Sequence, residues 1–509
     1  MICNKDRLFK LILWLIVVNK SATSTVTRRI KTINIATPGS LTVSSATGLP
    51  FIAPAIESAI QELQREYAGV FNWTWDLIYD KSITNYTDFP YSADDLVAKW
   101  YYKQRPPADL TVLLYAGGPE SETINRLAAG WNTLMITSTA TVPTQRNKEL
   151  SPSWLTTGCC LSTNFVKPYV YLMKANNWTS LYLVVDAGTI TTPTVARDVS
   201  DAIKNIKGTQ HTVFTIPVGS RNEDTYDTAL REFRRSSRVL FFFGHSDSLK
   251  ALLIYVTLEP FRNIAMFGNL TSLVDKDEYL KRAFGSLIVV TIAQYINQPG
   301  PEATSRFAQW KSISSTEFNY TYRQTEQLSP HVASAYYTML LLAEVLNETL
   351  EDNPDMNLLD GSALARRFFN RTVKIDSLSV YVDEAGERRT DMEIRQFNNE
   401  TGDFETIIIQ SGSNEKITQI RLLSWHGTGR FPSNEPVCGY AGNNPRCSQE
   451  GTWTAIMVSA VMVGIGLILA TIGVGYSWRR YMAAQADFRS WWDLSDWRVS
   501  SSRTLMPCA

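Results

Sequence analysis

Two cysteines near the C-terminus have a spacing that suits a disulfide bond. The stretch CGYAGNNPRC runs from Cys438 to Cys447 and precedes by six residues a long uncharged segment that begins at Trp453. In an oxidising compartment, two thiols at this spacing close a short loop that stabilises the fold by about 2–3 kcal/mol. Pairing between two chains is the alternative. The adjacent Cys159 and Cys160 suit neither a zinc pair nor an easy bridge, and their state stays open.

A second stretch matches part of the turn on which hydrolases place a nucleophilic serine. FFFGHSDS follows an apolar run and precedes a helical pattern, with Ser246 at the nucleophile position of G-x-S-x-G. The final glycine is replaced by Ser248. Because the histidines show no spacing that completes a triad, we favour the reading that Ser246 or Asp247 caps the helix that follows.

The loop AGGPES also follows an apolar run, and its backbone N–H groups are candidates to hold an anion near Gly118–Ser121. It fits neither G-x-G-x-x-G nor a P-loop, so a plain turn is the alternative. The spacing of His and Cys indicates no metal site, and no acidic pair stands out. We therefore expect a binding protein without catalytic residues, metal or cofactor.

Eight N-x-Thr sequons indicate N-glycosylation and an extracellular location. All lie before the uncharged segment, at Asn72, Asn85, Asn177, Asn269, Asn319, Asn347, Asn370 and Asn399. At the N-terminus, basic residues precede the apolar run Leu11–Val18, and small polar residues follow. This order predicts a signal peptide over residues 1–23, cleaved between Ser21 and Ser24.

The segment Trp453–Tyr476 contains no charged residue. Its helical length of about 36 Å is enough to cross a membrane with some tilt. Arg479 and Arg480 follow at once, which predicts a cytoplasmic C-terminal side. We expect a single-pass type I protein of the plasma membrane with a short cytoplasmic tail over residues 477–509.

The extracellular part alternates between strand-like and helix-like stretches over residues 31–430. This alternation predicts βαβ units with parallel sheets. About 400 residues exceed what one sheet usually organises, so we expect two lobes with a cleft between them. After the helical tract Leu328–Leu350, strands joined by turns at Glu384–Gly386 and Thr401–Asp403 predict an appended hairpin-rich end. The net charge of zero argues against nucleic-acid binding.

Several of these stretches resemble the receptor guanylate cyclases and natriuretic peptide receptors. The similar features are the F-N-R-T step at Phe369–Thr372, the hairpin Leu378–Asp391, the turn Asn399–Phe404 and the loop CGYAGNNPRC. Leu378 and Glu387 replace a glycine and an aspartate of the family's hairpin pattern. The strand-loop-helix RVLFFFGHSDSLKALL is similar to one in the family's second lobe.

The resemblance implies the type I periplasmic-binding-protein fold for residues 31–430, followed by a juxtamembrane loop over 431–452 that the Cys438–Cys447 bridge closes. It also implies an extracellular ligand, a peptide or a small molecule, and a dimer. The family's chloride site is in doubt, because Ser121 replaces a cysteine and Glu120 adds a carboxylate. The residues that contact ligand cannot be transferred.

We therefore expect a ligand-binding receptor subunit that forms a homodimer or a heterodimer with a related receptor and is not itself an enzyme. The spacings Ala460-xxx-Gly464 and Gly466-xxx-Ala470 in the span allow close helix approach. Two alternatives remain open. One is an incomplete copy of a full receptor guanylate cyclase that makes cyclic GMP. The other is a different receptor on the same fold, such as an amino-acid receptor ectodomain.

Overall fold

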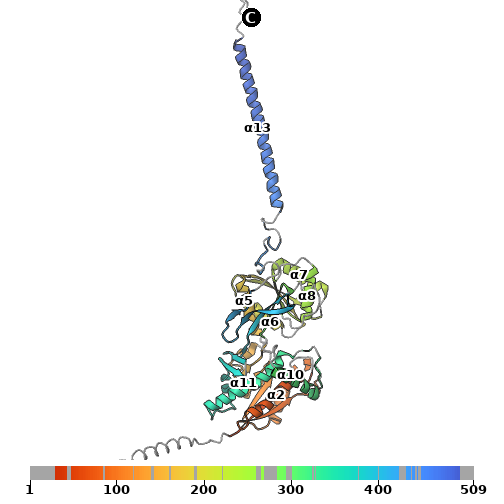
Figure 1. Cartoon of the computed structure of the whole chain (residues 1–509), viewed down its shortest axis with the longest axis vertical. Helices are drawn as coiled ribbons and strands as arrows, with labels where there is room; N and C mark the ends of the chain where they lie inside the picture. The colour runs from red at the N-terminus through yellow and green to blue at the C-terminus, as the bar shows by residue number, and fades with distance from the viewer. Residues whose placement is uncertain are drawn as a thin grey trace, which may run out of the picture. The chain divides into compact units, whose positions relative to one another are not determined.

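The computed structural model describes residues 29–42, 48–83, 86–118, 120–138, 143–159, 162–188, 192–219, 222–258, 265–268, 284–293, 301–323, 326, 328–375, 378–398, 400–422, 431–436, 438–441, 444 and 449–492. The expected signal peptide, residues 1–23, lies outside this set. The chain divides into two compact units, Met1–Asn434 and Glu435–Ala509. The first unit contains two α/β lobes, so the expected architecture is confirmed (Figure 1).

The first lobe is built on a five-stranded parallel sheet in the order β2-β1-β3-β4-β5. Its strands are β1 (Lys31–Pro38), β2 (Phe71–Ile78), β3 (Leu110–Tyr115), β4 (Leu134–Thr137) and β5 (Trp154–Thr156). Every residue of β3 and β4 is buried. Burial on both faces is typical of parallel sheets, and it explains why these strands are apolar runs rather than alternating patterns.

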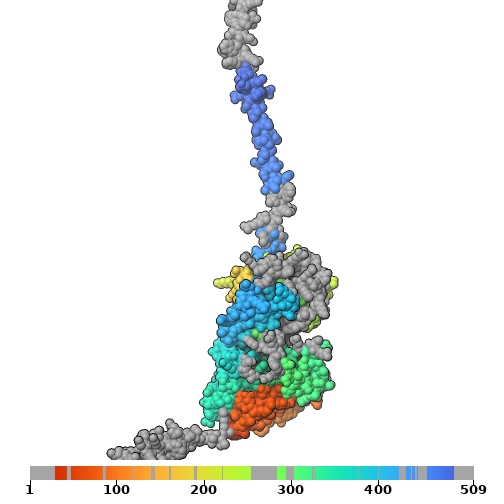
Figure 2. Space-filling model, in the orientation of Figure 1, coloured from red at the N-terminus to blue at the C-terminus, as the bar shows by residue number. Residues whose placement is uncertain are grey.

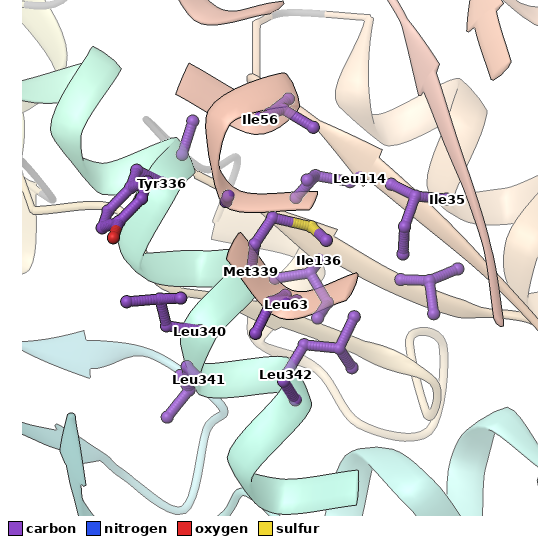
Figure 3. Packing of buried hydrophobic residues seen from close by; sticks show 14 of the residues in the cluster. Ile35, Ile56, Leu63, Leu114, Ile136, Tyr336, Met339, Leu340, Leu341 and Leu342 are labelled. Atoms are coloured by element: carbon purple, nitrogen blue, oxygen red, sulfur yellow. The ribbon is translucent and has the colours of Figure 1, made fainter. Parts of the chain in front are cut away.

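Helices cover both faces of this sheet. They are α2 (Leu49–Glu66), α10 (Pro301–Phe318) and α11 (Pro330–Asp352) on one face and α3 (Ala93–Lys103) and α4 (Ser121–Gly130) on the other. On the first face, Leu63 of α2 and Met339 of α11 pack over Ile35 and Leu114 of the sheet (Figure 3). The short elements η1 (Tyr86–Tyr91), η2 (Pro143–Arg146) and α12 (Gly361–Arg366) complete the lobe.

The second lobe contains an eight-stranded mixed sheet in the order β16-β15-β14-β10-β9-β8-β6-β7. Its parallel strands are β6 (Ser180–Asp186), β7 (Gln210–Ile216), β8 (Val239–Phe243), β9 (Ala265–Gly268) and β10 (Leu287–Ile292). Helices α5 (Ser162–Ala175) and α6 (Thr192–Lys204) contribute to one core, and α7 (Glu223–Ser236) and α8 (Ser246–Leu258) to the other.

The two C-terminal hairpins do not form one appended end, as the sequence suggested, but belong to different lobes. Strands β11 (Arg371–Ile375), β12 (Leu378–Val382) and β13 (Arg388–Arg389) form a small antiparallel sheet whose valines join the core of the first lobe. Strands β14 (Met392–Asn398), β15 (Asp403–Gln410) and β16 (Ile417–Gln419) extend the sheet of the second lobe. The physical reason is that β14 pairs with β10, more than 100 residues earlier in the chain, and no local pattern encodes that pairing.

The chain therefore passes between the lobes three times. The first crossover lies between β5 and α5, the second lies between β10 and α10, and the third joins β13 to β14 at Thr390–Asp391. In the space-filling view, the teal surface of the first lobe meets the blue surface of the strands that follow the third crossover (Figure 2). These three crossovers form the hinge.

The second unit contains the long helix α13 (Gln449–Trp492). Within it, Ala455–Gln485 is long and apolar enough to cross a membrane. The expected span, residues 453–476, lies inside this helix. The helix continues beyond Tyr476 to Trp492, so a helical extension leads into the segment expected to be the cytoplasmic tail.

Candidate functional site

A buried carboxylate at the hinge contacts both lobes. Glu387, in the turn between β12 and β13, is completely buried. Its Oε1 accepts a 2.6 Å hydrogen bond from Nε of Arg146, at the end of η2 in the first lobe. Its Oε2 accepts a 3.0 Å hydrogen bond from the hydroxyl of Thr163, in α5 of the second lobe. Arg146 also lies 3.9 Å from Asp198 of α6. A charged group in the hinge thus links the lobes directly.

The turn that carries Glu387 is fixed by a second ion pair. Arg389 donates through Nε at 2.7 Å to Asp383, and its Nη2 lies 2.6 Å from the same carboxylate oxygen. The other oxygen of Asp383 accepts from the backbone N–H of Glu387 at 2.8 Å. Gly386 has φ +75°, and a Cβ there would come within 2.9 Å of both Lys148 and Phe369. The turn therefore requires glycine at this position.

Lys148 packs against this turn from the first lobe. Its Nζ donates to the carbonyl of Trp154 at 2.7 Å and lies over the rings of Trp154 and Phe369, 4.4 and 4.7 Å from their centroids. Burial lowers the pKa of Lys148 to about 7, although the carboxylates of Glu387 and Asp383 act in the opposite direction. The hinge thus contains a lysine amine whose pKa lies near neutral pH.

The first and third crossovers are also joined to each other and to α11. The carbonyl of Thr157 accepts from the hydroxyl of Ser334 on α11 at 2.9 Å and from Nη1 of Arg388 at 3.3 Å. The hydroxyl of Thr390 donates to the carbonyl of Cys159 at 2.9 Å, and Asn164 of α5 donates to that hydroxyl at 2.8 Å. These hydrogen bonds therefore link the two crossovers to helices of both lobes, α11 and α5.

Beside this network lies a cavity of about 90 Å³. Its wall includes Cys159 of the first crossover, Ile292 and Ala293 at the second, and Arg388 to Asp391 at the third. Pro330 and Ser334 of α11 and Ser379 of β12 also belong to the wall. All three crossovers therefore border the same small space.

Sequence reasoning did not identify this cluster. The run D-E-A-G-E-R-R-T-D, residues 383–391, gave a turn signal, but its charged partners Arg146 and Lys148 lie more than 200 residues earlier. Each partner looks like an ordinary surface charge in its local context. Only the concentration of acidic and basic residues around a glycine turn offered a signal, and it did not distinguish a solvated turn from a buried one.

The expected anion loop contains its own buried acid. Glu120, immediately before α4, is 3% exposed, and its Oε1 accepts a hydrogen bond from the hydroxyl of Tyr115. Its Oε2 is buried with no hydrogen-bond partner among the described residues. Burial raises the pKa of this carboxyl. An external anion near Gly118–Ser121 would lie beside this carboxyl, which disfavours such a site whenever the carboxyl is charged.

The serine stretch behaves as a helix start. Ser246 is the first residue of α8, and Ser248 donates at 2.6 Å to the buried carboxylate of Asp186 at the end of β6. Of the four histidines, His211 lies 2.8 Å from the hydroxyl of Ser200. Within the described parts of the chain, no cluster of His, Cys, Asp and Glu is arranged to hold a metal ion.

The remaining predicted site residues are only partly described. Asn72, Asn177, Asn319 and Asn370 are exposed and Asn347 is half-buried, whereas Asn85, Asn269 and Asn399 lie outside the described residues. Cys438 is disulfide-bonded. Its expected partner Cys447, like Cys160, lies outside the described residues. The Cys438–Cys447 pairing and the use of the sequons stay predictions.

Comparison with known proteins gives a family match and two related receptors. The family model "Receptor family ligand binding region" matches residues 109–400, more than half of the chain. Atrial natriuretic peptide receptor 2 from Homo sapiens is 26% identical over 203 residues, which cover 39% of this chain and 18% of the relative. The receptor of the same name from Bos taurus matches with the same identity and coverage. The similarity thus spans less than a fifth of the length of these relatives.

Proposed function

Because this chain belongs to the receptor family defined by the ligand-binding region at residues 109–400, we propose that it is a single-pass cell-surface receptor subunit whose two extracellular lobes bind a ligand. The observation that carries the proposal is the hinge. Three crossovers join the two α/β lobes, and the buried Glu387 accepts hydrogen bonds from Arg146 of the first lobe and Thr163 of the second.

Because the lobes are joined by a hinge, we expect ligand binding to change the angle between them. A ligand that contacts both lobes favours the lobe angle at which its contacts are best, and it shifts the population toward that angle. Arg146 and Thr163 approach Glu387 from different lobes. Lobe rotation therefore changes the distances within a charged cluster, where small displacements have large electrostatic consequences.

The proposed topology places the lobes outside the cell and the C-terminal end of α13 inside. Ala455–Gln485 has the length and composition of a span, and Arg479 and Arg480 near its end favour the cytoplasmic side. The exposed sequon residues of the first unit are consistent with glycans on an extracellular surface. A disulfide between Cys438 and Cys447 would stiffen the segment before the span.

The ligand class comes from the relatives, which are named as receptors for atrial natriuretic peptide. We propose a peptide of this kind as the ligand, bound in or beside the cleft between the lobes. We also propose that the subunit acts as a dimer, with itself or with a related receptor. Residues 1–509 would serve binding and coupling, without a cofactor and without making cyclic GMP themselves.

The test is peptide binding to intact cells that display the full chain with an N-terminal epitope tag. Antibody staining without permeabilisation should detect the tag, and fluorescent atrial natriuretic peptide should bind saturably. Glu387→Leu should weaken peptide binding at equal surface staining, whereas Arg231→Met, on an exposed ion pair of α7, should not. A tag accessible only after permeabilisation would refute the topology. Surface-displayed chain without saturable binding would refute the peptide ligand.

A further inference from the structure

One face of helix α13 repeats at alternating spacings of three and four residues, from the expected span into the part that follows it. In the span the face consists of Met457, Ala460, Gly464, Leu467, Thr471 and Val474, and beyond the span of Trp478, Tyr481, Gln485, Phe488 and Trp492. We call these positions the α13 seam. The spacing is that of the a and d positions of a coiled coil, which face a partner helix. Because α13 is one continuous helix, the phase of the seam is the same in the span and beyond it (Figure 1).

Beyond the span, the seam differs in chemistry from the rest of the helix. Trp478 and Tyr481 are 66% and 58% exposed, and their ring centroids lie 6.4 Å apart. Nε2 of Gln485 donates to the hydroxyl of Tyr481 at 2.9 Å, so consecutive seam side chains contact each other. The charged residues of this part of the helix fall outside the seam, at Arg479, Arg480, Asp487 and Arg489. An aromatic stripe on a helix with its charges elsewhere indicates a face that another surface covers.

The membrane surface fits only the beginning of this stripe. From Tyr476, where the expected span ends, to Trp492 the helix rises about 24 Å, whereas the head-group layer is roughly 5–8 Å thick. To lie flat on that layer, the helix would need a sharp kink, and such kinks occur mostly at proline, glycine or a break in the helical hydrogen bonds. Residues 476–492 contain neither proline nor glycine, and they are helical throughout. The seam therefore continues along the axis of the span, and a second helix is the surface that fits it.

A second copy of the same helix matches the seam along its length. Two copies anchored in one membrane are parallel, so symmetry places each seam residue opposite its own counterpart. Ala460 and Gly464 then let the two backbones approach closely within the span. The amide of Gln485 meets a second amide, and a polar residue at an a position favours one register of the pair. The other small-residue spacing, Gly466-xxx-Ala470, is out of phase with the aromatic positions and does not belong to this contact.

We propose that the α13 seam pairs with the same seam of a second copy of this chain, as a parallel coiled coil that begins in the span and continues beyond Tyr476. This inference rests on the single-pass topology and the dimer proposed above, and it assigns the residues of the contact. Because the pair is continuous, a rotation of the two spans moves the residues that follow them as well.

The test is disulfide crosslinking of the full chain in isolated membranes, with one cysteine introduced at a time and Cys508→Ser as the background. Oxidation with copper phenanthroline should crosslink Val474→Cys and Tyr481→Cys as dimers, because the two copies of each seam position lie within reach of a disulfide. The matched controls Leu469→Cys and Tyr476→Cys lie on the opposite face of the helix and should crosslink several-fold less.

A second variant pair tests whether the part beyond the span supports the contact within it. Tyr481→Ala should reduce crosslinking through Val474→Cys several-fold, because it removes a seam side chain. Tyr476→Ala removes the same kind of side chain from the opposite face and should leave that crosslinking unchanged.

Three outcomes would overturn the proposal. Crosslinking through Val474→Cys without crosslinking through Tyr481→Cys would restrict the contact to the span. Equal crosslinking on both faces would show random collision instead of a defined interface. Absence of crosslinking at all four positions would remove the seam, and it would leave the proposed dimer standing if an amine-reactive reagent still joins the lobes of two chains. Absence of dimer with both reagents would refute the dimer as well. Peptide binding is measured separately and does not depend on these results.

Discussion

The buried carboxylates of Glu387 and Glu120 differ in the hydrogen-bond and ion-pair partners that surround them. Glu387 has Arg146 at 2.6 Å and Arg389 at 3.5 Å, so its charge is balanced. Glu120 has the hydroxyl of Tyr115 on one oxygen and no described partner on the other. The sequence did not reveal the partners of either carboxylate, because the fold determines which residues are buried and which lie next to each other. The sequence did flag Glu120 as an obstacle to an anion site.

The first prediction concerns Glu120. Because burial raises its pKa in the folded protein, its contribution to stability is fully present below the unfolded-state pKa and is lost as pH rises through the folded value. Glu120→Gln removes this titration, so the stability of the variant relative to wild type should increase as pH rises above the ordinary glutamate pKa of about 4.5. The measurement is thermal unfolding from pH 4 to pH 8.

The control for this prediction is Glu223→Gln, which changes an exposed glutamate in the first turn of α7. It should leave the pH profile close to that of the wild type. A constant offset between Glu120→Gln and wild type across the pH range would show that Glu120 does not titrate differently on folding.

At the scale of elements, the sequence predicts features that depend on neighbouring residues. It misses features that depend on pairing between distant segments. The alternation of strands and helices, the long helix after Pro330 and the turn at Glu384–Gly386 were predictable from periodicity and turn residues. Helix α10 was missed, because its apolar residues follow no clear helical stripe. The third crossover was missed because β13 and β14 are separated by only two residues yet belong to different sheets. The hinge site depends on that crossover, and so it was missed as well.

The second prediction is that Arg146 and Glu387 are strongly coupled. Arg146→Met and Glu387→Leu should each cost about 3–5 kcal/mol of unfolding free energy, because each leaves a buried charge with fewer partners. The double variant should cost clearly less than the sum. Thermal unfolding of the four proteins measures the coupling. The exposed pair Arg231–Asp227 of α7 is the control and should show less than about 1 kcal/mol. Additive costs at the hinge would contradict a direct interaction.

The third prediction concerns helix α13. Gly464 has open space around its Cα in the isolated helix, and Ala460 lies one turn before it. If this face packs against a second helix, Gly464→Leu should reduce chemically crosslinked dimer several-fold, because the larger side chain separates the backbones. Val463→Leu, one position away, should change little. The prediction fails if wild-type protein in membranes crosslinks only as monomer or if Gly464→Leu crosslinks as well as wild type.

At the scale of the whole molecule, the two-lobe region and the apolar helix are the parts expected of a membrane receptor. The relatives do not show which signal such a receptor would produce. The matches cover 18% of those relatives, so their activities beyond the matched region do not transfer to this chain. The fold class was predictable from alternation and length together with the resemblance. The ligand was not, because a ligand site is formed by side chains that lie far apart in the sequence.

The last prediction is that this 509-residue chain, expressed alone, makes no cyclic GMP. A nucleotide cyclase needs groups that hold metal ions and stabilise a triphosphate, mounted on a domain with its own core. Such domains usually need about 100–150 residues, whereas the described residues between Lys31 and Trp492 form the two lobes and the helix α13. In cells without other membrane cyclases, cyclic GMP should stay at the empty-vector level with or without atrial natriuretic peptide. Co-expressed with a full-length related cyclase, the chain should lower the peptide response through mixed dimers, and Gly464→Leu should restore it. A peptide-dependent rise in cells carrying this chain alone would overturn the prediction.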